Sequence, residues 1–161
     1  MQNKFILVVE DDPDDVALIS RALRKNNIWS DIEVAADGVE ALDFLFATGR
    51  YCGRDADHLP AVVLLDVKLP RLNGFEVLRQ IRAERATQHL PVIIVTSCWA
   101  VDDILRGYSL RADGYVCKSA DFDKLVNAIG HVGLDSLASG EPAHPSKARA
   151  LEKRLPSQTV I

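Results

Sequence analysis

Several features that would point to particular protein classes are scarce in this sequence. The chain of 161 residues has only three cysteines, which lie far apart and match neither a zinc-binding spacing nor a redox pair. Reduced thiols and a cytoplasmic location are therefore expected, rather than a disulfide framework. The four histidines are scattered along the chain and suggest no metal site of their own.

Two further absences exclude classes of partner. Acidic residues outnumber basic residues by 23 to 19, and the net charge of -4 offers no basic surface for nucleic acid or an anionic membrane. No apolar run approaches the roughly 18 residues that span a bilayer. Acids follow the apolar N-terminal stretch at once, which is unlike a secretory signal. Hydrophobic residues make up 48% of the chain, so its length predicts one domain with a substantial core.

What the sequence does contain is organised around residues 61–74. The first part of this stretch is continuously apolar through Leu65, which is typical of a strand buried on both faces of a parallel sheet. The run ends at Asp66, and turn-forming residues follow as far as Gly74. Ligand sites of open α/β sheets lie at the carboxyl ends of strands, so Asp66 stands where chemistry is expected. Taken alone, an aspartate there could equally just open the loop.

Apolar runs and amphipathic stretches alternate along the rest of the domain. Short apolar runs are expected to be strands, and stretches with apolar residues three and four apart are expected to be helices. Because the two kinds alternate, right-handed crossovers predict an α/β fold: a doubly wound, five-stranded parallel sheet of order 2-1-3-4-5, a flavodoxin-like three-layer sandwich. The expected strands are residues 5–9, 32–34, 61–65, 90–96 and 114–117, and the expected helices begin near residues 13, 39, 75, 100 and 122.

Two segments lack such periodicity. Residues 49–59 are polar and glycine-containing, and they are expected to be a surface loop. The composition changes again near residue 135, so residues 1–134 are assigned to the domain and residues 135–161 to a linker and C-terminal tail. Residues 147–155 of the tail could form a short helix, which would need a partner surface. That surface could belong to the same domain or to a second copy, so a homodimer is left open.

Polar side chains follow four of the five strands. They are Glu10 and Asp11 after the first, Asp66 after the third, Thr96 in the fourth and Lys118 after the fifth. The first and third strands are neighbours in the expected order, so three carboxylates should lie within a few ångströms and favour a hard divalent cation such as Mg²⁺. A carboxylate beside Mg²⁺ can attack phosphorus and form an aspartyl phosphate, for which Lys118 supplies a positive charge.

Further acids follow the first strand. Asp12, Asp14 and Asp15 surround Pro13, and they are expected to start a helix rather than to bind the metal. An aspartate is a good N-cap, and carboxylates in the first turn complement the helix dipole. No histidine or glutamate stands where a general base would be needed, which argues against a fast hydrolase.

Four motifs in this order resemble the receiver domain of two-component response regulators over Lys4 to about Gly133. They are ILVVEDD at residues 6–12, LLDVKLPRLNG at 64–74, PVIIVTS at 91–97 and YVCK at 115–118. The resemblance implies a single-domain regulator that accepts a phosphoryl group from a histidine kinase and switches a protein–protein surface. It implies a signalling protein rather than an enzyme, and no organic cofactor. The long loop at 49–59 and the lack of an appended output domain resemble regulators that partner bacterial phytochrome-type kinases.

The same resemblance implies a role for each of seven residues. The phosphoacceptor is Asp66, and Mg²⁺, which Mn²⁺ or Ca²⁺ could replace, is held by Glu10, Asp11, Asp66 and the backbone carbonyl of Lys68. Thr96 is the switch hydroxyl, Lys118 the phosphate-binding lysine and Tyr115 the switch aromatic. One departure concerns Ser119, since the family usually has proline after this lysine, often behind a cis peptide bond.

Three alternatives remain open. A small Mg²⁺-dependent phosphatase of the haloacid-dehalogenase type also uses a strand-end aspartate as nucleophile, but it needs a second acid two residues on, where this chain has Lys68. A flavin-binding module would need a phosphate-binding loop where the acids around Pro13 would repel the phosphate. A receiver fold that signals without phosphate is the third alternative.

Overall fold

The computed structural model describes residues 3–97, 100–118 and 123–131, in which five strands alternate with five α-helices and one short 3-10 helix. None of these helices combines the length and the apolar composition needed to cross a membrane. The strands are β1 (Phe5–Val9), β2 (Asp31–Ala35), β3 (Val62–Leu65), β4 (Val92–Thr96) and β5 (Gly114–Cys117). The helices are α1 (Pro13–Lys25), α2 (Gly38–Phe46), η1 (Gly49–Tyr51), α3 (Gly74–Ala83), α4 (Val101–Ser109) and α5 (Asp123–His131).

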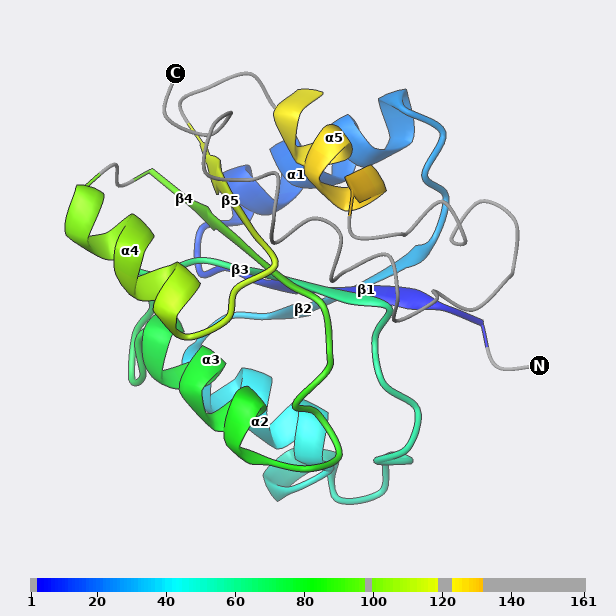
Figure 1. The fold of residues 1–161 in the computed structure, drawn as a ribbon. Coiled ribbons are helices and arrows are strands. Elements are labelled where there is room, and N and C mark those ends of the chain that lie inside the picture. Colours follow the sequence, from blue (N-terminus) through cyan, green and yellow to red (C-terminus); the bar gives the residue numbers. More distant parts are fainter. Residues whose placement is uncertain (1–2, 98–99, 119–122, 132–161) are drawn as a thin grey trace.

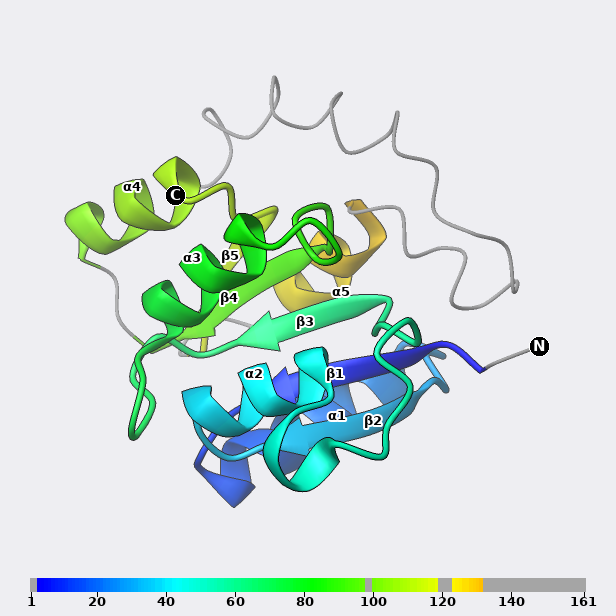
Figure 2. The same cartoon turned by 90° about the horizontal axis from the view of Figure 1, so that it is seen from below.

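The strands form one parallel sheet with the order β2-β1-β3-β4-β5. Helices α1 and α5 cover one face of this sheet, and α2, α3 and α4 cover the other (Figures 1 and 2). The prediction of a doubly wound three-layer sandwich is therefore confirmed. The order also brings β1 and β3 side by side, and the proposed site depends on this neighbourhood.

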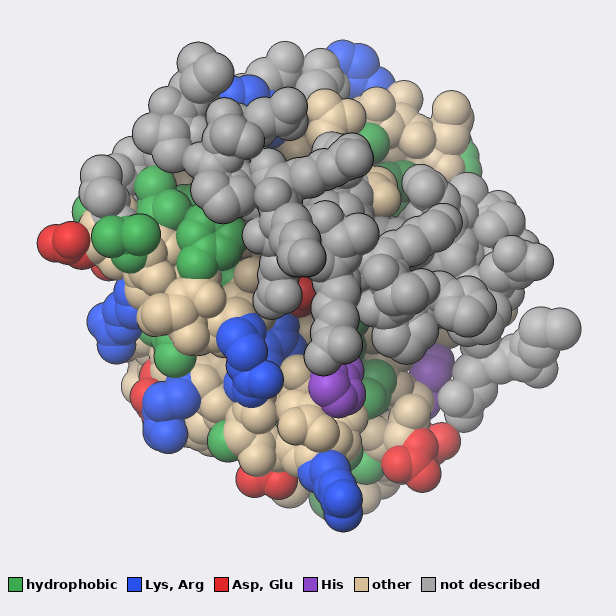
Figure 3. Space-filling view, in the orientation of Figure 1, with side chains coloured by type: hydrophobic (Ala, Val, Ile, Leu, Met, Phe, Trp, Pro, Cys, Tyr) green, Lys and Arg blue, Asp and Glu red, His purple; other side chains and the backbone are tan. Residues whose placement is uncertain are grey.

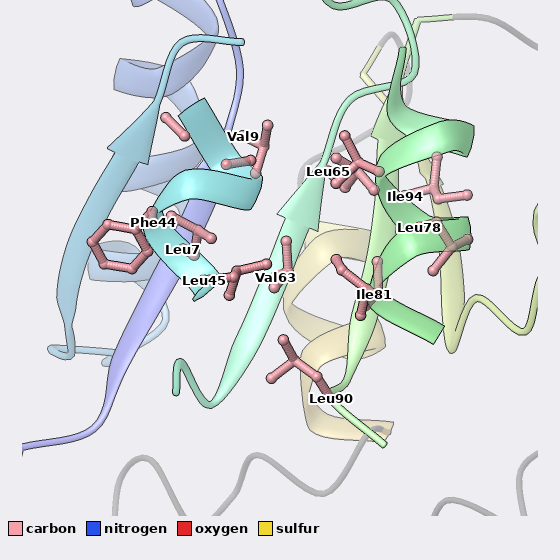
Figure 4. Close-up of a cluster of buried hydrophobic side chains, with 14 of the residues drawn as sticks. Leu7, Val9, Phe44, Leu45, Val63, Leu65, Leu78, Ile81, Leu90 and Ile94 are labelled. Carbon is pink, nitrogen blue, oxygen red and sulfur yellow. The ribbon is translucent and has the colours of Figure 1, made fainter. Parts of the chain in front are cut away.

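Alternate residues of each central strand enter different halves of the core. In β1, Leu7 and Val9 pack toward α2 and α3 (Figure 4). Ile6 and Val8 of the same strand pack toward α1 and α5. Every residue of β1, β3 and β4 is buried, which explains why these strands are continuously apolar in the sequence. Burying one such aliphatic side chain contributes about 1.5–3 kcal/mol, so the two half-cores are the main source of stability.

The loop between α2 and β3 has more structure than the sequence indicates. It begins with η1, and Arg54 then donates a hydrogen bond from Nη1 to the carbonyl of Phe44 at 2.8 Å. The Arg54 guanidinium also lies 4.0 Å from the centre of the Phe44 ring. The surface loop expected at 49–59 thus contains a 3-10 turn that the sequence did not indicate, because a single turn leaves no periodic pattern of apolar residues. The contacts of Arg54 with the ring and the carbonyl of Phe44 hold this part of the loop against α2.

Polar side chains cap the amino ends of three helices. The side chains of Asp12, Asp37 and Asn73 accept hydrogen bonds from backbone N–H groups in the first turns of α1, α2 and α3. Asn26 is the C-cap residue of α1. Within the described residues, Cys52 and Cys117 form no disulfide. The predicted tail at 135–161, with its helix at 147–155, lies outside the described residues, and the domain boundary at 134 stays a prediction.

A buried arginine joins the amino ends of β4 and β5. Arg82 of α3 is 9% exposed, and its guanidinium donates hydrogen bonds to the carbonyls of Leu90 and Arg111, at 2.6 Å and 2.9 Å for the shorter contacts. It also pairs with the carboxylate of Asp113 at 3.0 Å, and that carboxylate accepts the N–H of Val92. The charge is buried, but its donors are well satisfied by these partners.

We expect Arg82→Ala to lower the free energy of unfolding by about 3 kcal/mol, because it removes several hydrogen bonds and leaves buried acceptors unpaired. Urea denaturation followed by circular dichroism measures this loss. Arg79→Ala in the same helix is the matched control, since Arg79 is exposed and, among the described residues, pairs with Glu76 one turn earlier on the helix surface. The control should unfold close to the wild type, and equal losses in the two variants would contradict the role given to Arg82.

Candidate functional site at the carboxyl ends of the strands

The pairing of β1 with β3 fixes the acidic residues that follow these strands. Val9 lies opposite Leu65 in the register, and the N–H of Asp66 donates to the carbonyl of Val9 at 3.0 Å. The residues that come next, Glu10 and Asp66, therefore leave the sheet at the same edge. Carboxyl ends of adjacent parallel strands are the usual location of sites in open α/β sheets.

Gly74 lets the following helix close over this edge. The backbone N–H of Gly74 donates to the carbonyl of Val67 at 2.8 Å, and a Cβ at this position would lie 2.0 Å from the carbonyl oxygen of Asp66. No side chain fits in that space. The glycine expected from turn chemistry is thus also required by the close approach of α3 to the backbone of Asp66.

Three carboxylates converge as the sequence predicts. Glu10, Asp11 and Asp66 each offer one oxygen, and these oxygens all lie within 4.8 Å of one another. Glu10 and Asp66 are buried, at 3% and 6% exposure, and Asp11 is exposed. The pKa of Glu10 is raised to about 7, mainly by burial, because the lowering effect of the hydrogen bonds from Lys118 and from the Asp12 N–H is smaller; the nearby charge of Asp66 adds to the rise. Such a cluster favours a bound cation.

Lys118 provides the positive charge of the site. Its backbone N–H donates to the carbonyl of Thr96 at 2.9 Å, which fixes the end of β5 beside β4. Its ammonium Nζ lies 2.9 Å from Asp66 Oδ2 and 2.8 Å from Asp15 Oδ2, and it also contacts Glu10 Oε2. Burial alone would lower the pKa of Lys118, but the hydrogen bonds with these carboxylates raise it. One ammonium is therefore shared by three carboxylates.

The donor set fits a hard divalent cation. All the converging side-chain atoms are carboxylate oxygens, which Mg²⁺ and Mn²⁺ accept as ligands. Glu10 Oε2 is buried and, within the described part of the chain, accepts no well-directed hydrogen bond, although Lys118 lies against it. An acceptor of this kind is satisfied by a metal. Lys68 follows closely, with its N–H 3.4 Å from Asp66 Oδ1, and the role of its carbonyl as a ligand stays a prediction.

Thr96 and Tyr115 occupy the strands next to the cluster. Thr96 is the last residue of β4 and is completely buried. Tyr115 of β5 is 6% exposed and belongs to the half-core under α4. Gly107 of α4 brings this helix close, since a Cβ there would lie 3.6 Å from Tyr115 Cδ2 and 2.9 Å from Ile94 Cδ1. The switch roles of Thr96 and Tyr115 stay predictions, but the tyrosine does lie directly beneath α4.

Asp15 makes a contact in the site that the sequence reasoning did not predict. It was expected only to start α1, and it does lie in the first turn of that helix. The structure adds the ion pair with Lys118, 103 positions away. No helical spacing in the sequence indicates this contact, because Asp11 lies before α1, which begins at Pro13, and Lys118 follows a distant strand. Ser119 lies outside the described residues, so the isomer of the bond after Lys118 stays open.

Comparison with known proteins gives the family. The model of the response regulator receiver domain matches residues 6–130. The chain belongs to this family. Among curated relatives, this receiver is 31% identical to the response regulator Rcp1 of Synechocystis sp. over 83% of its own length and 91% of that protein. The family is the one that the sequence motifs indicated, and the observed strand order is the one predicted from the sequence.

Solved structures place the receiver near phytochrome response regulators. It is 40% identical to the bacteriophytochrome response regulator AtBRR, with a TM-score of 0.72 over 81% of this chain and 92% of that one. It is 30% identical to the phosphorylated cyanobacterial phytochrome response regulator RcpA, with a TM-score of 0.71 over 86% and 96%. The Mn²⁺-bound form of Rcp1 matches at a TM-score of 0.69, 31% identity, over 83% and 92%.

Proposed function

We propose that this receiver accepts a phosphoryl group on Asp66 in a reaction that depends on Mg²⁺. The observation that carries the proposal is the position of Asp66, with its carboxylate among the converging oxygens of Glu10 and Asp11 and 2.9 Å from the ammonium of Lys118. The similar proteins described as Mn²⁺-bound Rcp1 and phosphorylated RcpA give independent support.

The residues of the site have distinct tasks in this reaction. An oxygen of the Asp66 carboxylate attacks the phosphorus, and the bond between phosphorus and the leaving atom of the donor breaks. Glu10 and Asp11, with Asp66 and the carbonyl of Lys68, would hold Mg²⁺, for which Mn²⁺ or Ca²⁺ could substitute. The metal, when bound, neutralises charge on the phosphoryl oxygens. Lys118 supplies a second positive charge at hydrogen-bond distance from the acceptor carboxylate.

The signal would then pass to a surface for other proteins. The Thr96 side chain would move toward the phosphoryl group, and the Tyr115 side chain would move into the space that Thr96 leaves. These movements would change the face formed by α4, β5 and α5. Hydrophobic side chains gather over α4 on the molecular surface (Figure 3), and Leu105 of this helix is 61% exposed. A partner protein or a second copy of the chain would bind this face. The buried position of Tyr115 under α4 supports this route.

The proposed donor is a sensor histidine kinase of the phytochrome type. The names of the similar structures support this choice, since AtBRR and RcpA are both described as phytochrome response regulators. The acidic net charge favours protein partners over nucleic acid or membranes, and we infer a cytoplasmic location. A phosphatase is less favoured, because Lys68 stands where its second acid would be and is exposed. The receiver is therefore proposed to be a signalling protein rather than an enzyme.

Labelling with acetyl phosphate tests the proposal. The full chain is incubated with this small donor and either Mg²⁺ or EDTA, and acyl phosphate is detected by phosphate-affinity electrophoresis and located by mass spectrometry. We expect a hydroxylamine-sensitive label on Asp66 that requires the metal. Absence of label at saturating donor, or label on another residue, contradicts the proposal. Turnover of a generic phosphomonoester, measured in parallel, would favour the phosphatase instead.

A further inference from the structure

We infer that Asp15 is a positioning residue, which keeps the ammonium of Lys118 beside Asp66 when a metal occupies the neighbouring carboxylates. The inference rests on the proposed function and extends it to a helix that supplies none of the strand-end acids. Asp15 in the first turn of α1 would then have two roles: its charge stabilises the start of the helix, and its carboxylate positions Lys118 for phosphoryl transfer.

The geometry places Asp15 and Asp66 on the same ammonium. Lys118 Nζ is 2.8 Å from Asp15 Oδ2 and 2.9 Å from Asp66 Oδ2, with Glu10 as the third partner. An ammonium has three N–H donors, and the hydrogen bonds to Asp15 and Asp66 use two of them, while Glu10 forms an ion pair with the same ammonium. The side chain of Lys118 is 10% exposed and that of Asp15 is 26% exposed, so the contact is partly shielded from water and stronger than a surface ion pair.

Asp15 differs from the other two partners in its relation to the metal. The oxygens that converge within 4.8 Å belong to Glu10, Asp11 and Asp66, and Asp15 is outside this group. A divalent cation bound there would draw on the oxygens of Glu10 and Asp66 and would repel the ammonium. Asp15 is then the partner of Lys118 that the metal leaves available. Without it, Lys118 would move away from Asp66 at the stage when its charge is needed.

The scaffold around Asp15 suits this task. Asp15 lies in the first turn of α1, where Pro13 fixes the backbone and the side chain of Asp12 caps the helix by accepting the N–H of Asp14. The carboxylate is therefore held on a rigid element. Lys118 can keep one donor on Asp15 while another turns to a phosphoryl oxygen on Asp66, so the contact need not break during the reaction.

A matched pair of variants tests the inference. Asp15→Asn removes the charge that holds Lys118, and Asp14→Asn removes the same charge from the same helical turn. Asp14 is exposed, and its ordered contact is its backbone N–H on Asp12 rather than a side-chain contact with Lys118. Both variants therefore lose the same favourable interaction with the helix dipole and the same negative charge near the site. The labelling rate with acetyl phosphate and Mg²⁺ should fall about tenfold in Asp15→Asn and stay within about twofold in Asp14→Asn.

The same substitution in a Lys118→Met background separates positioning from folding. If Asp15 acts through Lys118, Asp15→Asn should not slow the double variant beyond Lys118→Met alone. In addition, the Lys118 ammonium of the Mg²⁺-loaded protein should give a slowly exchanging side-chain signal in ¹⁵N NMR. We expect this signal in the wild type and in Asp14→Asn and its loss in Asp15→Asn, which a purely structural role would not produce.

The outcomes distinguish this inference from the function on which it rests. A wild type that is labelled, with Asp15→Asn equal to or faster than Asp14→Asn, overturns the role of Asp15 alone. A full effect of Asp15→Asn in the Lys118→Met background overturns it as well, because the effect then bypasses the lysine. A wild type without any label on Asp66 overturns both the proposed function and the inference.

Discussion

Asp66→Asn is expected to reduce phosphoryl labelling of the receiver to background. The carboxamide lacks the anionic oxygen that attacks phosphorus, and it removes one of the three oxygens that converge on the metal position. The substitution keeps the size of the side chain, and the N–H of Asp66 that pairs with Val9 is part of the backbone. The variant should therefore retain its circular dichroism spectrum and a cooperative unfolding transition while losing the label.

The control for this variant is Asp57→Asn. Asp57 is an exposed carboxylate in the loop before β3, far from the cluster, and its loss changes the net charge by the same amount. It should be labelled at the wild-type level under the same donor and Mg²⁺ concentrations. A label of wild-type intensity on Asp66→Asn, wherever mass spectrometry locates it, would falsify the assignment of the phosphoacceptor.

The fold was predictable because its central strands obey a simple rule. β1, β3 and β4 are buried on both faces, so each is a continuous apolar run that no amphipathic helix would match. The edge strand β2 is mostly exposed, and only its short alternation indicated it, which is why the predicted range 32–34 is shorter than Asp31–Ala35. The contact of Arg54 with Phe44 of α2 could not be predicted in this way, because a single cation–π contact produces no periodic pattern in the sequence.

The site was predictable only where strand order determines it. Glu10 and Asp66 follow adjacent strands, so their meeting follows from the order of the sheet alone. The meeting of Lys118 with Asp15 depends instead on how α1 leaves β1 and on which way its first turn faces. From the sequence, Lys118 is predicted to bind phosphate and Asp15 to start a helix, and each prediction is consistent with the residues around it. Only the three-dimensional structure shows that the two side chains share a contact.

Lys118→Met is expected to lower both the stability of the fold and the rate of phosphoryl labelling. The variant removes the ammonium shared by the carboxylates of Glu10, Asp15 and Asp66. Two of these, Glu10 and Asp66, are almost completely buried and would lose their counter-ion, so the pair must either keep an uncompensated charge or take up a proton on Glu10. We expect the metal-free protein to lose about 3 kcal/mol of unfolding free energy in urea denaturation, and its labelling by acetyl phosphate to fall severely.

Added Mg²⁺ separates the two effects of Lys118→Met. A divalent cation among Glu10, Asp11 and Asp66 supplies the positive charge that the variant lacks, so saturating Mg²⁺ should recover much of the lost stability. Labelling should stay low, because the second charge at the acceptor is still missing. Lys124→Met, which makes the same substitution at an exposed position of α5, should alter neither quantity. A stability loss that Mg²⁺ leaves unchanged would mean that Lys118 acts through packing of its aliphatic stem and not through its charge.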